Sequence, residues 1–348
     1  MTKKILIKGN EAIAEAAIRA GCRFYAGYPI TPQNQIPEYM SWRQKEVGGV
    51  FIQAESELSA INMVFGASVA GVRAMTSSSS PGISLKQEGI SYMAANQLPG
   101  VIVNIMRGSP GLGSIQGSQG DYFQATRGGG HGDYHTIVLA PSSVQEAVEL
   151  TIQAFDLSDS YRIPVMLLGD GILGQMMEPI EFPEISRKKI PLKPWALTGC
   201  KGRKPNKIQS LLMATGQLEK HVLELEKNYK KIAKQETKWE EFQTDDAQII
   251  IVAYGIVARI AKGAIKIARD NGIKVGLLRP ITLWPFPYSP ISQFASKGKK
   301  FLVVEMSLGQ MLQDVKLGVD GKSKVLFYGR PGGSVITPED ILKKIKAI

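Results

Sequence analysis

The sequence is poor in cysteine and in long apolar runs, and each absence excludes a class of protein. Cys22 and Cys200 are the two cysteines, and they lie far apart without CxxC spacing. This chain alone therefore cannot hold an iron–sulfur cluster, and a disulfide scaffold is not expected. No apolar run approaches the length of a membrane span. Residues 1–5 lead into a strand pattern rather than a signal peptide, which predicts a cytoplasmic protein.

Two kinds of ligand-binding signal are also missing. No G-x-G-x-x-G motif follows the first expected strand, which argues against a Rossmann-type nucleotide binder. The net charge is +11, but the basic residues gather mainly in 187–238 and 297–300, with few aromatic residues between them. No recognised nucleic-acid motif is present either. We therefore expect a charged partner subunit rather than nucleic acid.

Strand-like and helix-like segments alternate throughout residues 1–169, which predicts an open, doubly wound α/β domain. The continuous apolar run 101–106 is typical of a central parallel strand, and Asn10 is expected to cap a helix over 11–20. From Glu178 the composition shifts to Pro, Lys and Arg. We divide the chain into a first domain (1–185), a linker with a charged helix (186–245) and a second α/β domain (246–348).

The linker helix carries a narrow apolar seam amid charged residues, with steps of four and three. Two partners for this seam remain open, namely the chain's own domains and another subunit. The seam consists of Leu218, Val222, Leu225, Tyr229 and Ile232.

Two carboxylates, Glu55 and Glu57, follow the strand that ends near Ala54 and are expected in the first turn of an apolar helix. Acidic residues in a first turn often only complement the helix dipole. One element later comes a loop of small hydroxylated residues, 76–82. A carboxylate and hydroxyl groups at neighbouring strand ends indicate a site, and Glu57 is the stronger candidate.

Two further strand ends carry candidate ligand-binding residues. The loop Gly27-Tyr28-Pro29-Ile30-Thr31-Pro32 is stiffened by its two prolines, so the Thr31 hydroxyl is held in one place, either as part of a simple turn or to bind a ligand. Arg107 ends the central strand and precedes a glycine-rich segment. A guanidinium there suits recognition of a carboxylate or phosphate, although a solvated strand-end arginine is the alternative.

Other polar motifs give weaker signals. The glycine-rich segment 108–132 has the length of a functional loop or an interface. His131 and His135 have no carboxylate or nucleophile in register. The Gly169-Asp170-Gly171 motif resembles the start of the magnesium motif of thiamine-diphosphate enzymes, but the required asparagine is missing downstream, so we interpret it as a strand-end turn.

Together, four segments resemble the alpha-type subunit of the 2-oxoacid:ferredoxin oxidoreductases, over nearly the whole chain. They are residues 27–32, 53–58, 75–82 and 103–108. Residues 77–82, 120–124 and 128–133 look most like the branched-chain (3-methyl-2-oxobutanoate, ketoisovalerate) branch, and the 2-oxoglutarate branch is the alternative. The resemblance implies a thiamine-diphosphate pyrimidine-binding domain followed by a transketolase-C-terminal-like domain.

The resemblance also implies roles for individual residues. Glu57 matches the glutamate that hydrogen-bonds N1′ of the aminopyrimidine, Thr31 matches a threonine that contacts substrate and cofactor, and Arg107 matches an arginine that pairs with the substrate carboxylate. The implied catalytic residues are thus Glu57, Thr31 and Arg107. The implied cofactor-binding residues are Tyr28, Pro29, Ile30, Thr31, Glu57, Ser79 and Ser80, and this chain is expected to hold no metal.

The family further implies a division of labour between subunits. A beta-type subunit supplies the diphosphate and Mg²⁺ motif and a 4Fe–4S cluster, and a ferredoxin-like delta-type subunit carries further clusters beside a gamma-type subunit. Coenzyme A accepts the acyl group, and ferredoxin takes the electrons. A non-catalytic scaffold protein with the same fold is the alternative from a different class.

Overall fold

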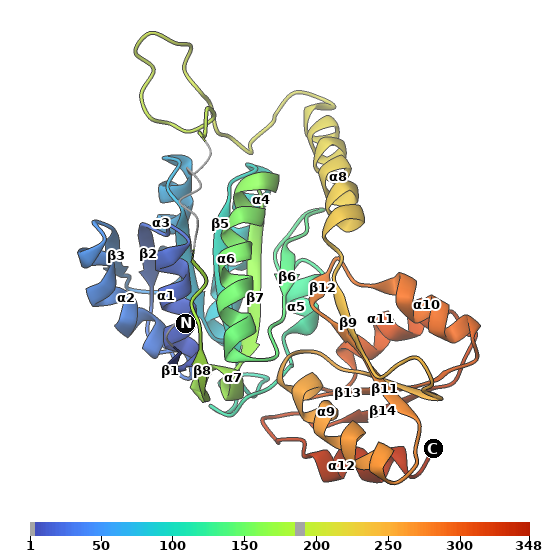
Figure 1. Cartoon of the computed structure of the whole chain (residues 1–348). Coiled ribbons are helices and arrows are strands. Elements are labelled where there is room, and N and C mark those ends of the chain that lie inside the picture. The colour runs from blue at the N-terminus through green and yellow to red at the C-terminus, as the bar shows by residue number, and fades with distance from the viewer. Residues whose placement is uncertain (1–3, 185–191) are drawn as a thin grey trace.

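The computed structural model describes residues 4–184 and 192–348. The expected domain boundary at 185/186 and the start of the basic segment at Arg187 fall outside the described residues. The two α/β units lie against each other, and the linker helix α8 (Gln217–Glu236) stands beside them (Figure 1). Among the helices described, none combines the length and apolar character that crossing a membrane requires.

The first unit is built on a seven-stranded sheet with the order β12-β6-β7-β5-β4-β2-β3. All neighbours in it are parallel except β12 and β6. The predicted central strand is confirmed, because β5 lies between β4 and β7 and all its residues are buried. The strands are β2 (Phe24–Gly27), β3 (Val50–Gln53), β4 (Ala74–Ser78), β5 (Gly100–Met106), β6 (Ile137–Leu139), β7 (Pro164–Asp170) and β12 (Thr282–Trp284).

Helices cover both faces of this sheet, so the predicted doubly wound fold is confirmed. α1 packs against α2 and α6, and α3 packs against α4. Right-handed crossovers place these two groups on opposite faces, and Figure 1 shows α1 and α6 side by side in front of the strands. The helices are α1 (Gly9–Arg19), α2 (Gln35–Glu46), α3 (Glu57–Val69), α4 (Ser80–Ala95), α5 (Tyr122–Thr126), α6 (Val144–Tyr161) and α7 (Gly171–Gln175).

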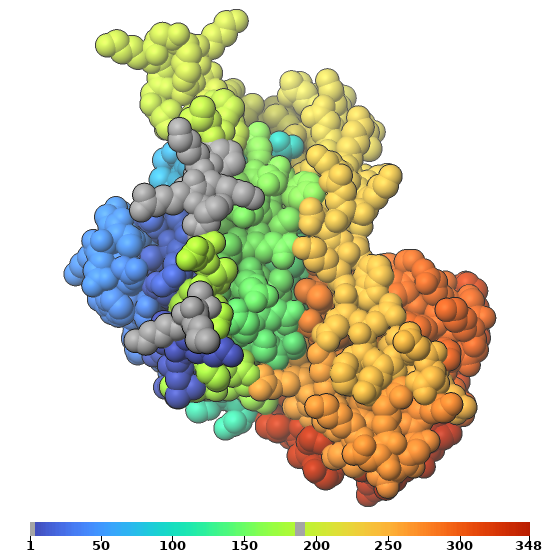
Figure 2. Space-filling view, in the orientation of Figure 1, coloured from blue at the N-terminus to red at the C-terminus, as the bar shows by residue number. Residues whose placement is uncertain are grey.

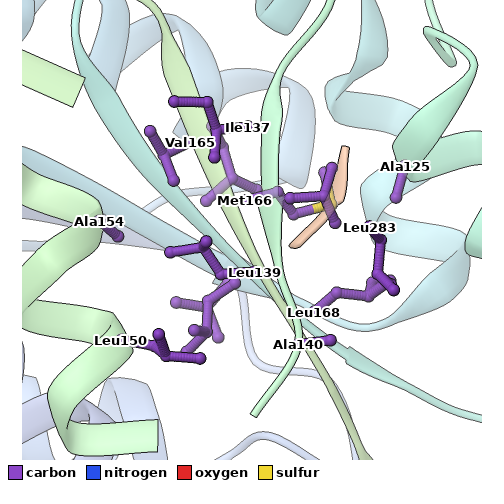
Figure 3. Packing of buried hydrophobic residues seen from close by; sticks show 14 of the residues in the cluster. Ala125, Ile137, Leu139, Ala140, Leu150, Ala154, Val165, Met166, Leu168 and Leu283 are labelled. Carbon is purple, nitrogen blue, oxygen red and sulfur yellow. The ribbon is translucent and has the colours of Figure 1, made fainter. Parts of the chain in front are cut away.

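The core of the first unit fills both faces of the sheet with aliphatic side chains. Leu139 points toward Leu150 and Ala154 of α6, whereas Leu168 and Leu283 lie on the other side of the strands (Figure 3). These side chains are at most 6% exposed. Burying a Leu or Val side chain stabilises the fold by roughly 1.5–3 kcal/mol, so this packing fixes the strand ends that carry the polar residues.

The N-terminal prediction was partly wrong. β1 (Ile5–Lys8) is a strand, but it pairs antiparallel with β8 (Met177–Ile180) in a separate two-stranded sheet. The change in composition at Glu178 therefore begins inside this small sheet. Asn10 does not cap α1, because it lies inside the helix and its amide donates to Pro32 O at 2.8 Å.

The second unit has a five-stranded sheet with the order β14-β13-β10-β11-β9, in which only β9 is antiparallel to its neighbour. α9 packs with α12 and α10 with α11. Thr337 and Asp340 cap α12 with a complete capping box. The elements are β9 (Trp239–Phe242), β10 (Ile249–Val252), β11 (Val275–Pro280), β13 (Lys300–Glu305), β14 (Val325–Gly329), α9 (Gly255–Asp270), α10 (Tyr288–Ser296), α11 (Gln310–Val319) and α12 (Pro338–Ile345).

The two units share a core. The short strand β12 follows β11 of the second unit and pairs with β6 of the first, from Thr282 to Leu139. One face of the second sheet, with Ile250 and Val252, belongs to the same buried cluster as the first sheet. The second unit is therefore bound tightly to the first.

A buried arginine also joins the two units. Arg279, at the end of β11, is 5% exposed at its side chain and donates two hydrogen bonds to Glu146 of α6 and one to Glu240 of β9. Glu146 also takes part in capping α6. It lies three residues after the N-cap Ser143, and its backbone N–H donates to the Ser143 hydroxyl. Its carboxylate does not return to Ser143, so only half of a capping box forms.

The seam of the linker helix packs on the chain's own first unit. Leu225, Tyr229 and Ile232 are at most 3% exposed and belong to the main core cluster, whereas Leu218 at the start of the helix is 52% exposed. The preceding segment, much of which lies away from the rest of the molecule in Figures 1 and 2, leaves Met213 84% exposed. For Leu225, Tyr229 and Ile232, the partner of the seam is therefore the chain's own core rather than another subunit.

Candidate active site

The candidate residues gather at one edge of the first sheet. Because β2, β3, β4 and β5 are parallel, the segments after them meet at the same edge. These segments carry Thr31, Glu57, Ser79 and Arg107, respectively. The structure therefore brings together residues that sequence reasoning took from four separate loops.

Glu57 is the first residue of α3 and is only 6% exposed. Ser56 caps the helix by accepting a hydrogen bond from Ser59 N at 3.2 Å, which fixes the backbone just before Glu57. Glu55 lies outside the helix, so placing both carboxylates in the first turn was wrong. Glu55 is exposed and accepts a hydrogen bond from the Ser59 hydroxyl at 2.6 Å. Of the two carboxylates, only Glu57 is buried.

The hydroxyl-rich stretch 76–82 was predicted to be a loop, and this prediction was wrong. The stretch forms the end of β4 and the start of α4. Because this stretch continues the buried strand, Ser78 Oγ reaches Glu57 Oε1 and donates to it at 3.4 Å. A Cβ atom on Gly82 would lie 2.3 Å from Glu57 Oε1 and 2.1 Å from Ser78 Oγ. The Glu57 carboxylate therefore occupies space that exists only because residue 82 is glycine.

We expect Gly82→Ala to displace the Glu57 carboxylate and to lower activity of the assembled enzyme at least about 10-fold, because a misplacement near 1 Å can cost that much or more. Gly66→Ala is the matched control, since Gly66 also lies in a helix but no atom of the described residues is within 4 Å of an added Cβ. The control should keep full activity and gain about 0.5–1 kcal/mol of stability. Equal activity of both variants in a steady-state assay would contradict the close contact.

Arg107 lies at the end of β5 and is 8% exposed. Its Nη1 donates to Thr31 O at 3.0 Å and its Nη2 to Leu112 O at 2.9 Å, so it ties the Thr31 loop to the glycine-rich segment. A guanidinium has five N–H donors. Its Nε–H is buried and finds no acceptor among residues 4–184 and 192–348. Arg107 therefore keeps donors for a further acceptor.

The two serines predicted to bind cofactor differ in their surroundings. Ser80 Oγ donates to Asp121 Oδ2 at 2.6 Å and accepts from Arg107 N at 3.1 Å. Its hydroxyl is thus committed inside the protein. The Ser79 hydroxyl is fully buried, and no residue that the structure describes pairs with it. Burial raises the pKa of Asp121, against the lowering effect of its bonds from Ser80 and Asn104.

The loop after β2 forms the outer wall of this edge. Tyr28 is 38% exposed, Pro29 is also exposed, and Ile30 and Thr31 are half-buried. The Thr31 hydroxyl accepts a long hydrogen bond from Asn34 Nδ2 at 3.4 Å. Apolar surface and one partly exposed hydroxyl therefore lie on the loop that Arg107 holds.

The side chains of three further polar residues from the sequence, His131, His135 and Asp170, have structural contacts. His131 packs against Tyr92, and His135 stacks on Trp284 at 4.4 Å between ring centroids. Asp170 of the Gly-Asp-Gly motif ends β7 and caps α7 by accepting from Ile172 N and Leu173 N. The motif therefore lies at a strand end, as predicted, but it begins a helix rather than a turn. Burial raises the pKa of Asp170 to about 6.

Sequence reasoning missed Lys86. Its side chain is completely buried on α4, and its Nζ donates to Glu57 O at 3.4 Å. The signal was available in the spacing, because Lys86 stands three residues after Ile83 and four before Ile90, on the apolar face of the helix. A charged residue on the apolar face of a helix often indicates a function.

Comparison with known families identifies the chain. The family model described as "Pyruvate flavodoxin/ferredoxin oxidoreductase, thiamine diP-bdg" matches residues 15–243, and "Pyruvate:ferredoxin oxidoreductase core domain II" matches residues 247–341. This chain is an alpha-type subunit of the 2-oxoacid:ferredoxin oxidoreductase family. The alpha-type subunit shares 49% identity with ketoisovalerate oxidoreductase subunit VorB of Methanothermobacter thermautotrophicus, over 99% of this chain and 97% of the relative.

Other relatives of the alpha-type subunit are more distant. 2-Oxoglutarate synthase subunit KorA of the same organism is 39% identical over 99% of both chains. The solved 2-oxoglutarate:ferredoxin oxidoreductase from Magnetococcus marinus, with 2-oxoglutarate, coenzyme A and succinyl-CoA bound, superposes with a TM-score of 0.86 at 26% identity. That match covers 99% of this chain and 65% of the other. A split-gene transketolase matches with a TM-score of 0.60 at 13% identity over 98% of this chain and 97% of that one, a likeness of fold alone.

Proposed function

We propose that the alpha-type subunit forms half of an enzyme that oxidatively decarboxylates a branched-chain 2-oxoacid, 3-methyl-2-oxobutanoate, to the acyl-CoA, CO₂ and reduced ferredoxin. The observation that carries the substrate proposal is the higher identity to the ketoisovalerate subunit, 49%, than to the 2-oxoglutarate subunit, 39%, over nearly the whole chain. The class of reaction is supported by the family itself.

The residues at the sheet edge fit the aminopyrimidine end of thiamine diphosphate. The Ser79 hydroxyl is an orphaned buried polar atom among the described residues, and such atoms normally have partners. The buried Glu57 carboxylate accepts a weak hydrogen bond from Ser78 Oγ, at 3.4 Å. The exposed Tyr28 and Pro29 add an apolar wall for a heterocycle. Donor, acceptor and apolar wall are the groups that a pyrimidine ring needs.

Each residue has a proposed task. Thiamine diphosphate supplies, when bound, the electron sink that decarboxylation of a 2-oxoacid needs. Glu57 would hold a proton at N1′ of the aminopyrimidine. Thr31 would contact substrate and cofactor from the loop whose carbonyl Arg107 holds. Ser79 would donate a hydrogen bond to the cofactor, and Ser80, whose hydroxyl already joins Asp121, would orient Arg107 through its backbone N–H.

The rest of the proposed active centre belongs to partners. We propose that a beta-type subunit supplies the diphosphate and Mg²⁺ site and a 4Fe–4S cluster, with gamma-type and ferredoxin-like delta-type subunits beside it. Support on this chain comes from the exposed apolar side chains around the edge, including Leu58, Leu112 and Ile115, which are 44%, 82% and 58% exposed. Clustered exposed apolar side chains usually mark an interface.

The substrate proposal is tested by assaying the reconstituted complex with coenzyme A and viologen as electron acceptor. We expect kcat/KM for 2-oxoisovalerate to exceed that for pyruvate and 2-oxoglutarate at least about 10-fold, which corresponds to about 1.4 kcal/mol of discrimination. Preference for 2-oxoglutarate would favour the second candidate, which is supported by the relatives that act on that acid.

A non-catalytic scaffold remains the alternative of a different class. It predicts that no cofactor is held at any subunit interface, even when a beta-type partner is present. A fluorimetric thiamine assay on the co-purified complex distinguishes the two. About one thiamine for each alpha-type subunit supports the enzyme, and none supports the scaffold.

Replacing Arg107 tests the substrate-binding proposal. We expect Arg107→Ala to raise the KM for the 2-oxoacid about 10- to 100-fold, because a charge-assisted hydrogen bond contributes about 1.5–3 kcal/mol. The Kd for thiamine diphosphate should change much less. Arg107→Lys is the matched control, which keeps the charge but cannot form paired hydrogen bonds. Unchanged steady-state kinetics in Arg107→Ala would refute the role.

We also retain two organisational proposals. The chain is divided into a pyrimidine-binding domain (1–185), a linker with a charged helix (186–245) and a transketolase-C-terminal-like domain (246–348) that serves as a platform for assembly. We propose a cytoplasmic location, because Cys22 and Cys200 are both free thiols and the cytoplasm keeps thiols reduced.

A further inference from the structure

Lys86 is the most unusual buried group in the first unit. Its side chain is 0% exposed, and it is among the largest fully buried side chains. Lysines are almost never fully buried unless they are paired. In the described part of the chain no carboxylate oxygen lies within salt-bridge distance of its Nζ, whose one hydrogen bond goes to the backbone oxygen of Glu57 at 3.4 Å. The ammonium group is therefore buried without a neutralising contact.

The charge of Lys86 is poised near neutral pH. Burial lowers its pKa to about 7, and the negative charge of Glu57 opposes that shift. Within residues 4–184 and 192–348, Glu57 is the one charged group that acts on it appreciably. Glu88, further along the same helix, is exposed. Asp121 and the backbone of Arg107 bond to Ser80, at the first residue of α4. Lys86 is thus coupled mainly to Glu57.

A core-filling role does not account for this arrangement. An aliphatic side chain of similar length, such as Met, would fill the same space without the cost of burying an amine. Lys86 therefore weakens the fold at a position where an apolar residue would serve, and it does so next to the carboxylate that the proposed function uses. Sites that break a packing rule in this way are commonly functional.

We propose that Lys86 is a positioning residue that holds the first turn of α3 through the carbonyl of Glu57 and balances the charge of the Glu57 side chain. The inference rests on the proposed role of Glu57. The negative charge of the Glu57 side chain favours the protonated form of Lys86, against the effect of burial. Coupling of this kind is reciprocal, so binding of a proton-sharing ring at Glu57 displaces part of the proton on Lys86.

The test uses the reconstituted complex and three variants: Lys86→Met, Lys86→Gln and Glu57→Gln. Proton exchange on binding of thiamine diphosphate with Mg²⁺ is measured calorimetrically at pH 7 in buffers of different ionisation heat. Differences between variants cancel the protons that belong to the diphosphate. We expect Lys86→Met to differ from the wild type by a measurable fraction of a proton, because it lacks the group that releases one.

Lys86→Gln separates the two parts of the proposal. It keeps an N–H donor for the Glu57 carbonyl but has no charge to titrate. We expect it to show the altered proton exchange of Lys86→Met while recovering part of its kcat. In Lys86→Met, kcat at pH 7 should fall at least about 10-fold with little change in KM, because a small displacement of an acting group has effects of that size. Proton exchange and kcat equal to those of the wild type in both variants would overturn the inference.

Thermal unfolding provides a readout that does not depend on the cofactor. Burial lowers the pKa of Lys86 to about 7 in the folded state, so between that pH and its ordinary value of 10.5 the unfolded chain binds more protons at this residue. The contribution of Lys86 to wild-type stability therefore rises with pH across this window. Lys86→Met lacks this contribution and should be at least as stable as the wild type at pH 7. A parallel pH dependence of both melting temperatures would overturn the premise.

Failure of this inference and failure of the proposed function give different results. If Glu57→Gln weakens cofactor binding or activity and the Lys86 variants behave as wild type, only the role of Lys86 is wrong. If Glu57→Gln also leaves cofactor binding and activity unchanged, the proposed function of this site is wrong as well.

Discussion

Glu57→Gln is expected to lower kcat of the reconstituted complex at least about 100-fold, while the subunits still assemble. An amide is nearly isosteric with the carboxyl group but cannot pass a proton to a ring nitrogen, and positioned proton transfer contributes about 10²–10⁴-fold to a rate. The side chain is 6% exposed and lies against Ser78, so Gln should occupy the same space. Steady-state kinetics and size-exclusion chromatography measure the two parts of this expectation.

Glu55→Gln is the matched control for this experiment. Glu55 stands two residues earlier and is exposed, and within residues 4–184 and 192–348 its side chain bonds only to the Ser59 hydroxyl. Changes at exposed positions of this kind usually alter stability by less than about 0.5 kcal/mol, so this variant should keep wild-type activity. Full activity in Glu57→Gln or Glu57→Ala would remove the basis for the proposed site.

Arg279→Met is expected to destabilise the chain by about 3 kcal/mol or more, because it leaves two partly buried carboxylates without their common partner. Those carboxylates, Glu146 and Glu240, are 17% and 29% exposed at their side chains, whereas Arg279 is 5% exposed. Since this arginine joins α6 of the first unit to β11 and β9 of the second, the loss should weaken the contact between them. Denaturant unfolding of the purified chain measures the effect.

Arg259→Met is the matched control for the stability experiment. Arg259 pairs with Glu178, but it is 44% exposed, and exposed ion pairs contribute about 0–1 kcal/mol. Adding Glu146→Gln to Arg279→Met should restore part of the lost stability, because one uncompensated charge disappears. Equal destabilisation by Arg279→Met and Arg259→Met would show that burial of the network is unimportant.

The parts of the fold that depend on local patterns could be predicted. A continuous apolar run such as that of β5 predicts a central parallel strand, and Thr337 with Asp340 predicts the start of α12. The gathering of the candidate residues could be predicted because the ends of parallel strands meet at one edge. The sequence alone therefore predicts that Thr31, Glu57 and Arg107 lie near one another.

The parts that depend on distant partners could not be predicted. Nothing local in the sequence indicates that β1 pairs with β8 or that β12 leaves the second unit to pair with β6. Asn10 has the residue type of a helix cap, but its amide bonds to Pro32 O instead, a partner 22 residues away. Lys86 is a charged residue at a position on the apolar face of α4. The sequence does not show that Glu57 lies beside it, and the fold does.

The central claim is that this chain supplies half of a shared thiamine-diphosphate site, and calorimetric titration tests it most directly. Thiamine diphosphate with Mg²⁺ is titrated into the alpha-type subunit, into its beta-type partner and into the two together. The account predicts stoichiometric binding only to the pair, weakened by Glu57→Gln on the alpha-type chain. Binding to either subunit alone as tight as binding to the pair, or no binding to the pair, would contradict it.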